Sequence, residues 1–200
     1  MNDDVVGRLA KGSLFSRLFG SGRQRLRLVA VPRDHVLGDR ARGDALLSGR
    51  LRYGSEEIGL AQVDFLGVGA QGALARHLQG FSWLRDLAAS ASREKGARLA
   101  EAIAGRWLIA HGPRVDEAWA PDLWGERILF WTAYAPYILS SRDAGYRSAL
   151  LNTLARGARH LDANAERAPP GLPRITAWAG APVSLPTVQG AQSRLSRLEA

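Results

Sequence analysis

Aromatic side chains and one arginine gather in a short part of the sequence, between residues 107 and 137. They are Trp107, Trp119, Trp124, Arg127, Trp131, Tyr134 and Tyr137. Flat aromatic faces stack on sugar rings, and a guanidinium binds a carboxylate through two parallel hydrogen bonds. The combination is typical of a platform for sugars that carry carboxylates, although packing in a core explains any single member of the set more simply.

Two pairs of carboxylates offer acid–base chemistry, Asp116-Glu117 and Asp122 with Glu126. Two acids that flank a glycosidic bond can hydrolyse it. Acidic residues in a first helical turn also stabilise the helix start, and Glu126 is within local reach of Arg127 or Arg114. We therefore expect the second pair to be structural, and hydrolysis remains the alternative.

The four histidines offer no metal site, because no two of them lie at the spacing of metal ligands. They are His35, His77, His111 and His160. The chain contains no cysteine, which excludes disulfides, iron–sulfur clusters, thiolate zinc sites and cysteine nucleophiles. We expect no metal ion and no cofactor.

Residues 67–72 read GVGAQG, which matches the glycine pattern of dinucleotide-binding loops. Such a loop needs a strand before it and a second strand that ends in an acidic residue about 20 positions later. That position falls near Glu94, between two predicted helices. We expect a glycine-rich connector, with dinucleotide binding as the alternative.

The elements that position these residues are predicted to be helical from about residue 72. Apolar residues recur three or four apart and predict helices over 73–89, through 100–108 up to His111, over 122–140 with a kink at Pro136, and over 146–161. The third helix is apolar nearly all round, which predicts burial between other helices. Short Gly and Pro turns between such helices are typical of antiparallel helical hairpins.

The first 60 residues read as a small irregular lobe with short strands. We expect helices at 5–19 and 40–47 and strands at 25–31 and 50–53. Residues 61–200 then form the helical part. After residue 168, prolines interrupt the pattern until a helix resumes at 194–198, and we expect a truncation at the C-terminus.

Composition and charge fit a packed protein that binds anions. The 200 residues are 46% hydrophobic and 23% charged, and the net charge is +8, with Arg supplying all but two of the 27 cations. Arginine binds carboxylate, sulfate and phosphate groups well. The cations are spread from Arg8 to Arg197 instead of forming a dense block, so we expect no DNA partner. A non-enzymatic module for nucleic acid or another polyanion remains the alternative.

No apolar stretch approaches the length of a membrane span. The N-terminus begins with acidic residues and lacks the apolar core of a secretory signal, which predicts a cytoplasmic protein. Basic and apolar residues alternate within 5–19, where an amphipathic helix on an anionic membrane is the alternative to packing on the protein itself.

Four segments together resemble the amino-terminal region of heparinase II/III-like proteins. They are FSWLRDL at 81–87, WAPD at 119–122, RIL at 127–129 followed by Trp131, and the stretch from Tyr146 to Leu161. Their order and spacing are more specific than any single motif. The resemblance covers roughly residues 25–180.

This resemblance implies an incomplete (α/α) toroid, which in the family is followed by a β-sandwich domain, and we expect that domain to be missing from this chain. Family enzymes cleave uronate-containing acidic polysaccharides by β-elimination, and many are exported, so the periplasm is the alternative location. By resemblance, Trp119, Arg127 and Trp131 contact sugar in the cleft. We add their aromatic neighbours Trp124 and Tyr134 as candidate substrate-binding residues.

The catalytic residues of the family have no counterpart here that we can assign. Where an Asn-His element follows the fourth helix in the family, this chain reads RITAW at 174–178, and prolines at 182 and 186 stand where a helix continues. We therefore expect this chain alone not to cleave glycan.

Overall fold

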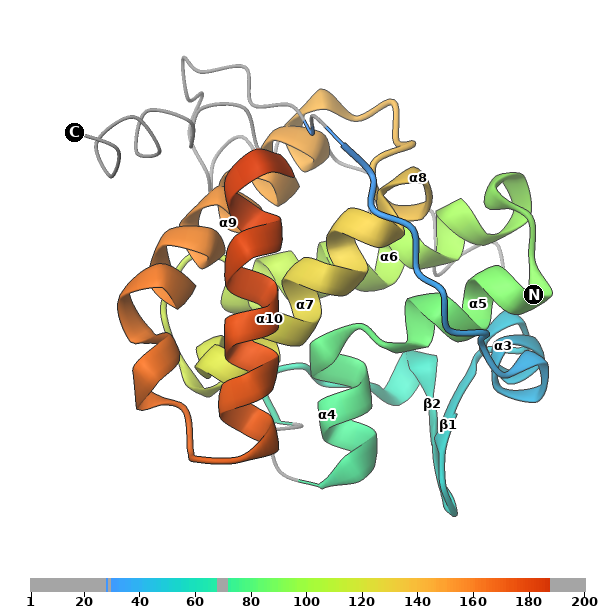
Figure 1. Cartoon of the computed structure of the whole chain (residues 1–200). Coiled ribbons are helices and arrows are strands. Elements are labelled where there is room, and N and C mark those ends of the chain that lie inside the picture. The colour runs from blue at the N-terminus through green and yellow to red at the C-terminus, as the bar shows by residue number, and fades with distance from the viewer. Residues whose placement is uncertain (1–27, 29, 68–71, 188–200) are drawn as a thin grey trace.

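The computed structural model describes residue 28 and residues 30–67 and 72–187, and it is mainly helical with one small β-hairpin (Figure 1). The predicted mainly helical class with a β-containing N-terminal part is confirmed. The predicted helices at 5–19 and 194–198 lie outside the described residues. So does most of the predicted strand at 25–31.

The N-terminal part contains α3 (Arg40–Leu47), β1 (Arg50–Tyr53) and β2 (Glu56–Gly59), followed by the short 3₁₀ helix η1 (Leu60–Gln62). The two strands pair antiparallel, with Arg50 opposite Gly59 and Tyr53 opposite Glu56. Helix α3 packs closely on the helix that contains Asp86. A Cβ at Gly43 would lie only 2.2 Å from the Asp86 carbonyl oxygen, so the absence of a side chain at Gly43 allows this approach. The helix at 40–47 and the strand at 50–53 agree with the sequence prediction.

The single helix predicted over 73–89 is wrong, because the structure divides it into α4 (Ala73–Gly80) and α5 (Trp83–Ser90). Phe81 between them has a left-handed backbone, with φ of 66°. This conformation costs a non-glycine residue about 1–2 kcal/mol. The fully buried Phe81 ring packs within 5.2–5.9 Å of three tryptophan rings, which offsets that cost.

The helix predicted over 122–140 is also divided. After α6 (Arg93–His111) and the 3₁₀ helix η2 (Glu117–Trp119), the chain forms α7 (Pro121–Ala133) and the short α8 (Ala135–Ile138). The break falls at Tyr134, two residues before Pro136, because proline lacks an N–H and clashes with the preceding turn. Helix α7 is buried on nearly every side, as its apolar sequence predicts.

The C-terminal part consists of α9 (Ala144–Asn164), the 3₁₀ helix η3 (Ala165–Arg167) and α10 (Leu172–Thr187). Asp143 caps α9 by accepting hydrogen bonds from the N–H groups of Gly145 and Tyr146. The predicted interruption after residue 168 is wrong beyond residue 172, since α10 continues through Pro182 and Pro186. Packing of its first half on α7 holds this helix in place despite the hydrogen bonds that proline removes.

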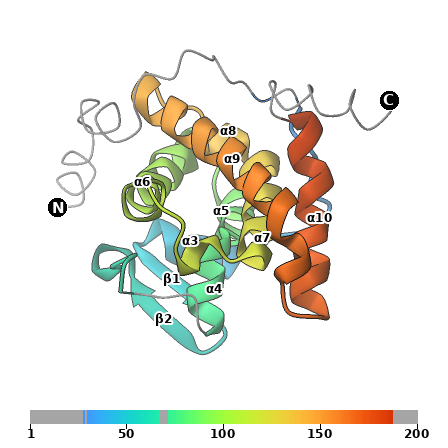
Figure 2. The ribbon, with the colours of Figure 1, turned by 90° about the vertical axis from the view of Figure 1, so that its left-hand side faces the viewer.

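Helix α7 is the centre of the helical part, where it contacts α4, α9 and α10. Figure 1 shows α10 crossing in front of α7, and Figure 2 shows α9 running over α6 and α10 at the end opposite the hairpin. The closest approach joins α7 to α10. A Cβ at Gly125 would lie 2.2 Å from the Thr176 carbonyl oxygen, and one at Gly180 would lie 2.6 Å from the Gly125 Cα.

Gly125→Ala should lower the free energy of unfolding by about 2 kcal/mol, because the added methyl group forces α7 and α10 apart. Urea denaturation followed by circular dichroism measures the change. Ala163→Ser, at an exposed position of α9, is the control and should shift stability by less than about 0.5 kcal/mol. Equal stability of Gly125→Ala and the parent chain would contradict the close α7–α10 contact.

Candidate functional site

The predicted aromatic and arginine cluster forms around Arg127, which is fully buried in α7. Its guanidinium carbon lies 4.2 Å from the centre of the Trp107 ring and 4.6 Å from that of Trp124. A cation between two indole faces is attracted by their negative π surfaces, and more strongly when water is excluded. The two tryptophans therefore stabilise a charge that burial alone would disfavour.

Hydrogen bonds complete the environment of Arg127. Its Nε and one terminal nitrogen donate to the Gln79 carbonyl oxygen at 3.0 and 2.6 Å, and the other terminal nitrogen donates to the Ala118 carbonyl oxygen at 2.9 Å. Burial lowers the pKa of Arg127 to about 9, although the negative charges of Glu126, Asp116 and Asp122 act to raise it. The side chain stays cationic at neutral pH and links the end of α4 to η2.

The remaining tryptophans of the cluster pack around this arginine. Ring centres lie 4.7 Å apart for Trp119 and Trp124, 5.8 Å for Trp124 and Trp131, and 5.4 Å for Trp107 and Trp131. The Trp119 indole donates to the His111 carbonyl oxygen at 2.8 Å. None of these four rings is more than 2% exposed. The structure thus assigns Trp119, Trp124, Trp131 and Arg127 to the core, where they present no face to a sugar.

Tyr134 lies apart from that core and is half-buried. Its hydroxyl donates to Asp34 at 2.9 Å, and the Arg85 Nε donates to the same carboxylate oxygen at 2.8 Å. Burial and the hydrogen bond to Asp34 raise the pKa of Tyr134. Burial opposes ionisation of Asp34, but the hydrogen bonds from Arg85, Val36 and Tyr134 lower its pKa. Tyr134 thus fixes the segment before α3 to the end of α7.

The carboxylates of α7 face α4. Asp122 is 5% exposed and forms an ion pair with Arg76 at 2.7 Å. Glu126 lies one turn later, where the absence of a side chain at Gly80 leaves room for it. Burial raises the pKa of Glu126, with Arg76 opposing and Asp122 adding to the shift. The ion pair at the helix start agrees with the structural role expected from the sequence.

Two histidines are engaged by hydrogen bonds. His111 is buried, with Nδ1 at 2.8 Å from an Asp116 carboxylate oxygen and Nε2 at 3.0 Å from the Phe65 carbonyl oxygen. The Nε2 atom of His160 lies 2.8 Å from the Trp119 carbonyl oxygen. Within residues 28, 30–67 and 72–187, no group of three His, Asp or Glu side chains is placed to hold a metal ion.

The glycine-rich segment at 67–72 does not follow a strand. The described residues before it form η1, an extended segment and a turn, and α4 begins at Ala73. The dinucleotide alternative needs a strand at this place and is therefore excluded. In the part of the chain that the structure describes, no helix has the length and apolar character needed to cross a membrane.

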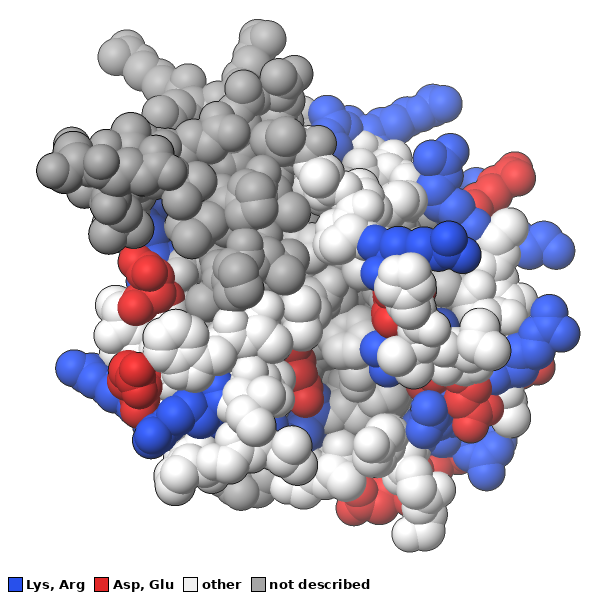
Figure 3. Space-filling view, in the orientation of Figure 1, with Lys and Arg blue, Asp and Glu red and all other residues white. Residues whose placement is uncertain are grey.

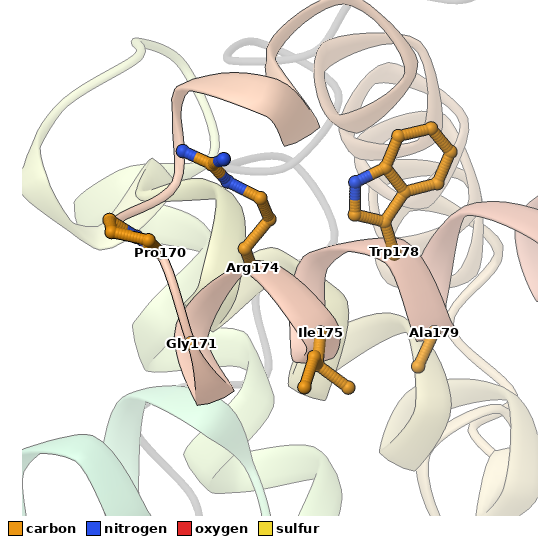
Figure 4. A pocket seen from close by; sticks show the side chains of 6 residues that line it. All are labelled: Pro170, Gly171, Arg174, Ile175, Trp178 and Ala179. Carbon is orange, nitrogen blue, oxygen red and sulfur yellow. The ribbon is translucent and has the colours of Figure 1, made fainter.

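An open hollow of about 580 Å³ lies on α10. It is lined by Pro170, Gly171, Arg174, Ile175, Trp178 and Ala179. Figure 4 shows the Arg174 and Trp178 side chains one turn apart on the same side of α10. Trp178 is 51% exposed, and the half-buried Arg174 donates from Nε to the Ala168 carbonyl oxygen at 3.0 Å.

Comparison of the chain with protein-family models, curated proteins and solved structures finds no match. The family resemblance therefore stays a prediction. The site rests on the geometry alone.

The hollow was not predicted from the sequence, because residues 174–178 stand out there only as a departure from a family pattern. The signal was present in the spacing of Leu172, Ile175 and Trp178, which lie three apart as on one side of a helix. All three are exposed, between 51% and 78%. Ile175 and Trp178 both line the hollow.

His77 on α4 is the most strongly perturbed histidine of the described residues and is 4% exposed. Burial lowers its pKa to about 4, while Asp86 from α5 raises it and Arg42 from α3 lowers it further. The Tyr53 ring of β1 covers it, with ring centres 4.6 Å apart. The folded protein therefore holds this imidazole neutral at pH 7.

Because the folded pKa of His77 lies below the unfolded value of 6.5, the unfolded chain binds an extra proton between these values. The stability that His77 contributes is fully present above pH 6.5. It falls by about 3 kcal/mol as the pH is lowered towards 4. The pKa of Glu126 is raised instead of lowered, so its effect on stability opposes that of His77 as the pH falls. Urea titrations should therefore compare the parent chain with His77→Gln across this pH range, which isolates the effect of His77. The difference should shrink on acidification, whereas His35→Gln, at an exposed site, should follow the parent. A pH-independent difference would contradict burial of a neutral His77.

Arg127→Ala should cost on the order of 4 kcal/mol, because it leaves the Gln79 and Ala118 carbonyls unpaired and opens a cavity between two indoles. Arg159→Ala, at an exposed position of α9, should change stability by less than about 0.5 kcal/mol. Chemical denaturation monitored by tryptophan fluorescence measures both. A fully stable Arg127→Ala protein would show that the arginine does not hold the core.

Proposed function

We propose that this chain is the helical, toroid-forming part of a heparinase II/III-like, polysaccharide lyase-type protein and that it binds uronate-containing glycan without cleaving it alone. The mainly helical fold and the quoted sequence segments support this assignment. In the proposed toroid, α6 with α7 and α9 with α10 are successive hairpins of a ring. The surface of α10 then supplies the glycan contact.

The hollow on α10 carries the proposal. The exposed face of Trp178 suits stacking on the apolar face of a pyranose ring. One turn earlier, Arg174 places a guanidinium beside it, and a uronate carboxylate on that ring accepts its hydrogen bonds. A volume of about 580 Å³ lies within the usual range of small-ligand sites.

The proposal that this chain does not cleave glycan alone is based on what β-elimination demands. A base must remove the proton next to the uronate carboxylate, whose developing charge must be neutralised. Among the described residues that line the hollow, Arg174 is the one charged side chain, and it neutralises a carboxylate but removes no proton. We therefore assign binding to this surface and leave the elimination chemistry to parts of the protein beyond it.

The alternative is a module for nucleic acid or another polyanion, which the net charge of +8 favours. Figure 3 shows Lys and Arg side chains over the right-hand flank of one face, with acidic side chains among them. Interspersed charges of both signs weaken the long-range field that such a partner requires. The glycan proposal depends on a local pair of side chains instead.

Trp178→Ala and Arg174→Ala should each weaken binding of polygalacturonate by about tenfold or more, because they remove the stacking face and the carboxylate partner. Isothermal titration calorimetry measures the affinity, with a neutral glucan as the ligand control. Arg98→Ala removes an exposed cation from α6 and should bind like the parent chain.

Three outcomes contradict the proposal. An equal loss of affinity in all three variants would favour the polyanion module. So would DNA binding that falls steeply with salt, together with no preference for uronate-containing glycan. Release of unsaturated uronate by the purified chain, seen as ultraviolet absorbance, would overturn the absence of cleavage.

A further inference from the structure

A serine and a histidine form a close pair at the junction of α4 and α5. The hydroxyl oxygen of Ser82 lies 2.6 Å from Nδ1 of His77. Since His77 is neutral at pH 7, its Nδ1 accepts the hydroxyl proton when the ring proton is on Nε2. Such a contact is the arrangement that activates a serine as a nucleophile.

A buried carboxylate stands on the other side of the imidazole. Nε2 of His77 lies 3.7 Å from Oδ2 of Asp86, which is 1% exposed and is also ion-paired with Arg42 Nε at 2.8 Å. The His77 Nε2 atom has no hydrogen-bond partner in the described residues. Oδ1 of Asp86 accepts from the Asp39 N–H at 2.8 Å and from Arg42 at 3.2 Å, which fixes the carboxylate. Contacts of this kind are often long without substrate and shorten when the base becomes charged.

The backbone around Ser82 is a tight turn between two helices, and Ser82 itself has right-handed helical dihedral angles, with φ of −63° and ψ of −18°. Ser82 directly follows the left-handed Phe81 and opens α5, yet its hydroxyl does not cap that helix. The N–H groups of Leu84 and Arg85 donate to the Phe81 and Ser82 carbonyls, whereas the Trp83 N–H makes no backbone hydrogen bond in the described part of the chain. The N–H after a nucleophilic serine is the donor that stabilises the oxyanion in many hydrolases.

We propose that Ser82 is a nucleophile for acyl transfer from small esters, with His77 as its general base and Asp86 as a positioning residue. This activity is separate from the glycan binding proposed for α10 and uses none of its residues. Ser82 is half-buried, and Tyr53 covers the neighbouring imidazole, so the acyl group must be small, such as acetyl.

The reaction uses only the ester and water. Ser82 Oγ bonds to the acyl carbon while its proton passes to His77 Nδ1 and the carbonyl π electrons move to the oxygen. The Trp83 N–H is the proposed hydrogen-bond donor to this oxygen. Collapse of this intermediate breaks the bond to the alcohol, which leaves with the proton from Nδ1. Water then attacks the acyl-serine by the same steps, which releases the carboxylic acid and returns the proton to Oγ.

A fluorophosphonate probe tests the nucleophile directly, because Ser82 Oγ displaces fluoride from phosphorus and gains a stable phosphonyl group. Intact-protein and peptide mass spectrometry should find one group per chain, on Ser82. Ser82→Ala should take up none. Ser90→Ala, which removes a hydroxyl of the same helix bonded to the Arg40 carbonyl, should label like the parent.

Hydrolysis of p-nitrophenyl acetate is the second measurement. Ser82→Ala and His77→Gln should each lower kcat by at least about 100-fold, and Asp86→Asn should lower kcat while leaving KM unchanged. Circular dichroism establishes that each variant is folded, and if His77→Gln is not, labelling of the parent chain decides. An unlabelled Ser82 in folded protein, or undiminished turnover by Ser82→Ala, would overturn the proposal.

Discussion

The buried cation of Arg127 is the interaction on which the helical part of the molecule depends. It binds carbonyl oxygens of α4 and of the segment before α7, and it lies between the indoles of α6 and α7. Four separate segments thus meet at one guanidinium. A buried charge with no carboxylate in direct contact would cost several kcal/mol, and the aromatic faces and three hydrogen bonds offset this cost.

This constraint explains why the cluster that looks chemical in the sequence is structural. A guanidinium between tryptophans binds a carboxylated sugar only if one face is open, and here α4, α9 and α10 cover α7. The same side chains in the same order serve either purpose, and sequence spacing does not distinguish them. Burial decides, and the half-buried Arg174 with the exposed Trp178 has the chemistry that the buried set was expected to provide.

The sequence predicted the helical class, the strand at 50–53 and the burial of α7, since each depends on a regular pattern of apolar residues. It did not predict the turn at Phe81, because the apolar period continues across it and only tertiary packing stabilises a left-handed phenylalanine. Nor did it predict α10, where two prolines suggested an interruption but packing on α7 maintains the helix. The Ser82–His77 contact depends on the Phe81 turn, so it was hidden with it.

The position of the α10 hollow follows from contacts on the opposite side of that helix. Gly125 and Gly180 let the two backbones approach so closely that α10 has no freedom to rotate without a clash. Residues 176, 177 and 180 therefore face α7, and residues 174 and 178 are directed elsewhere. A glycine contact inside the protein thus sets which side of α10 meets solvent, and the exposure of Trp178 is a consequence of the same packing that buries the tryptophans of α7.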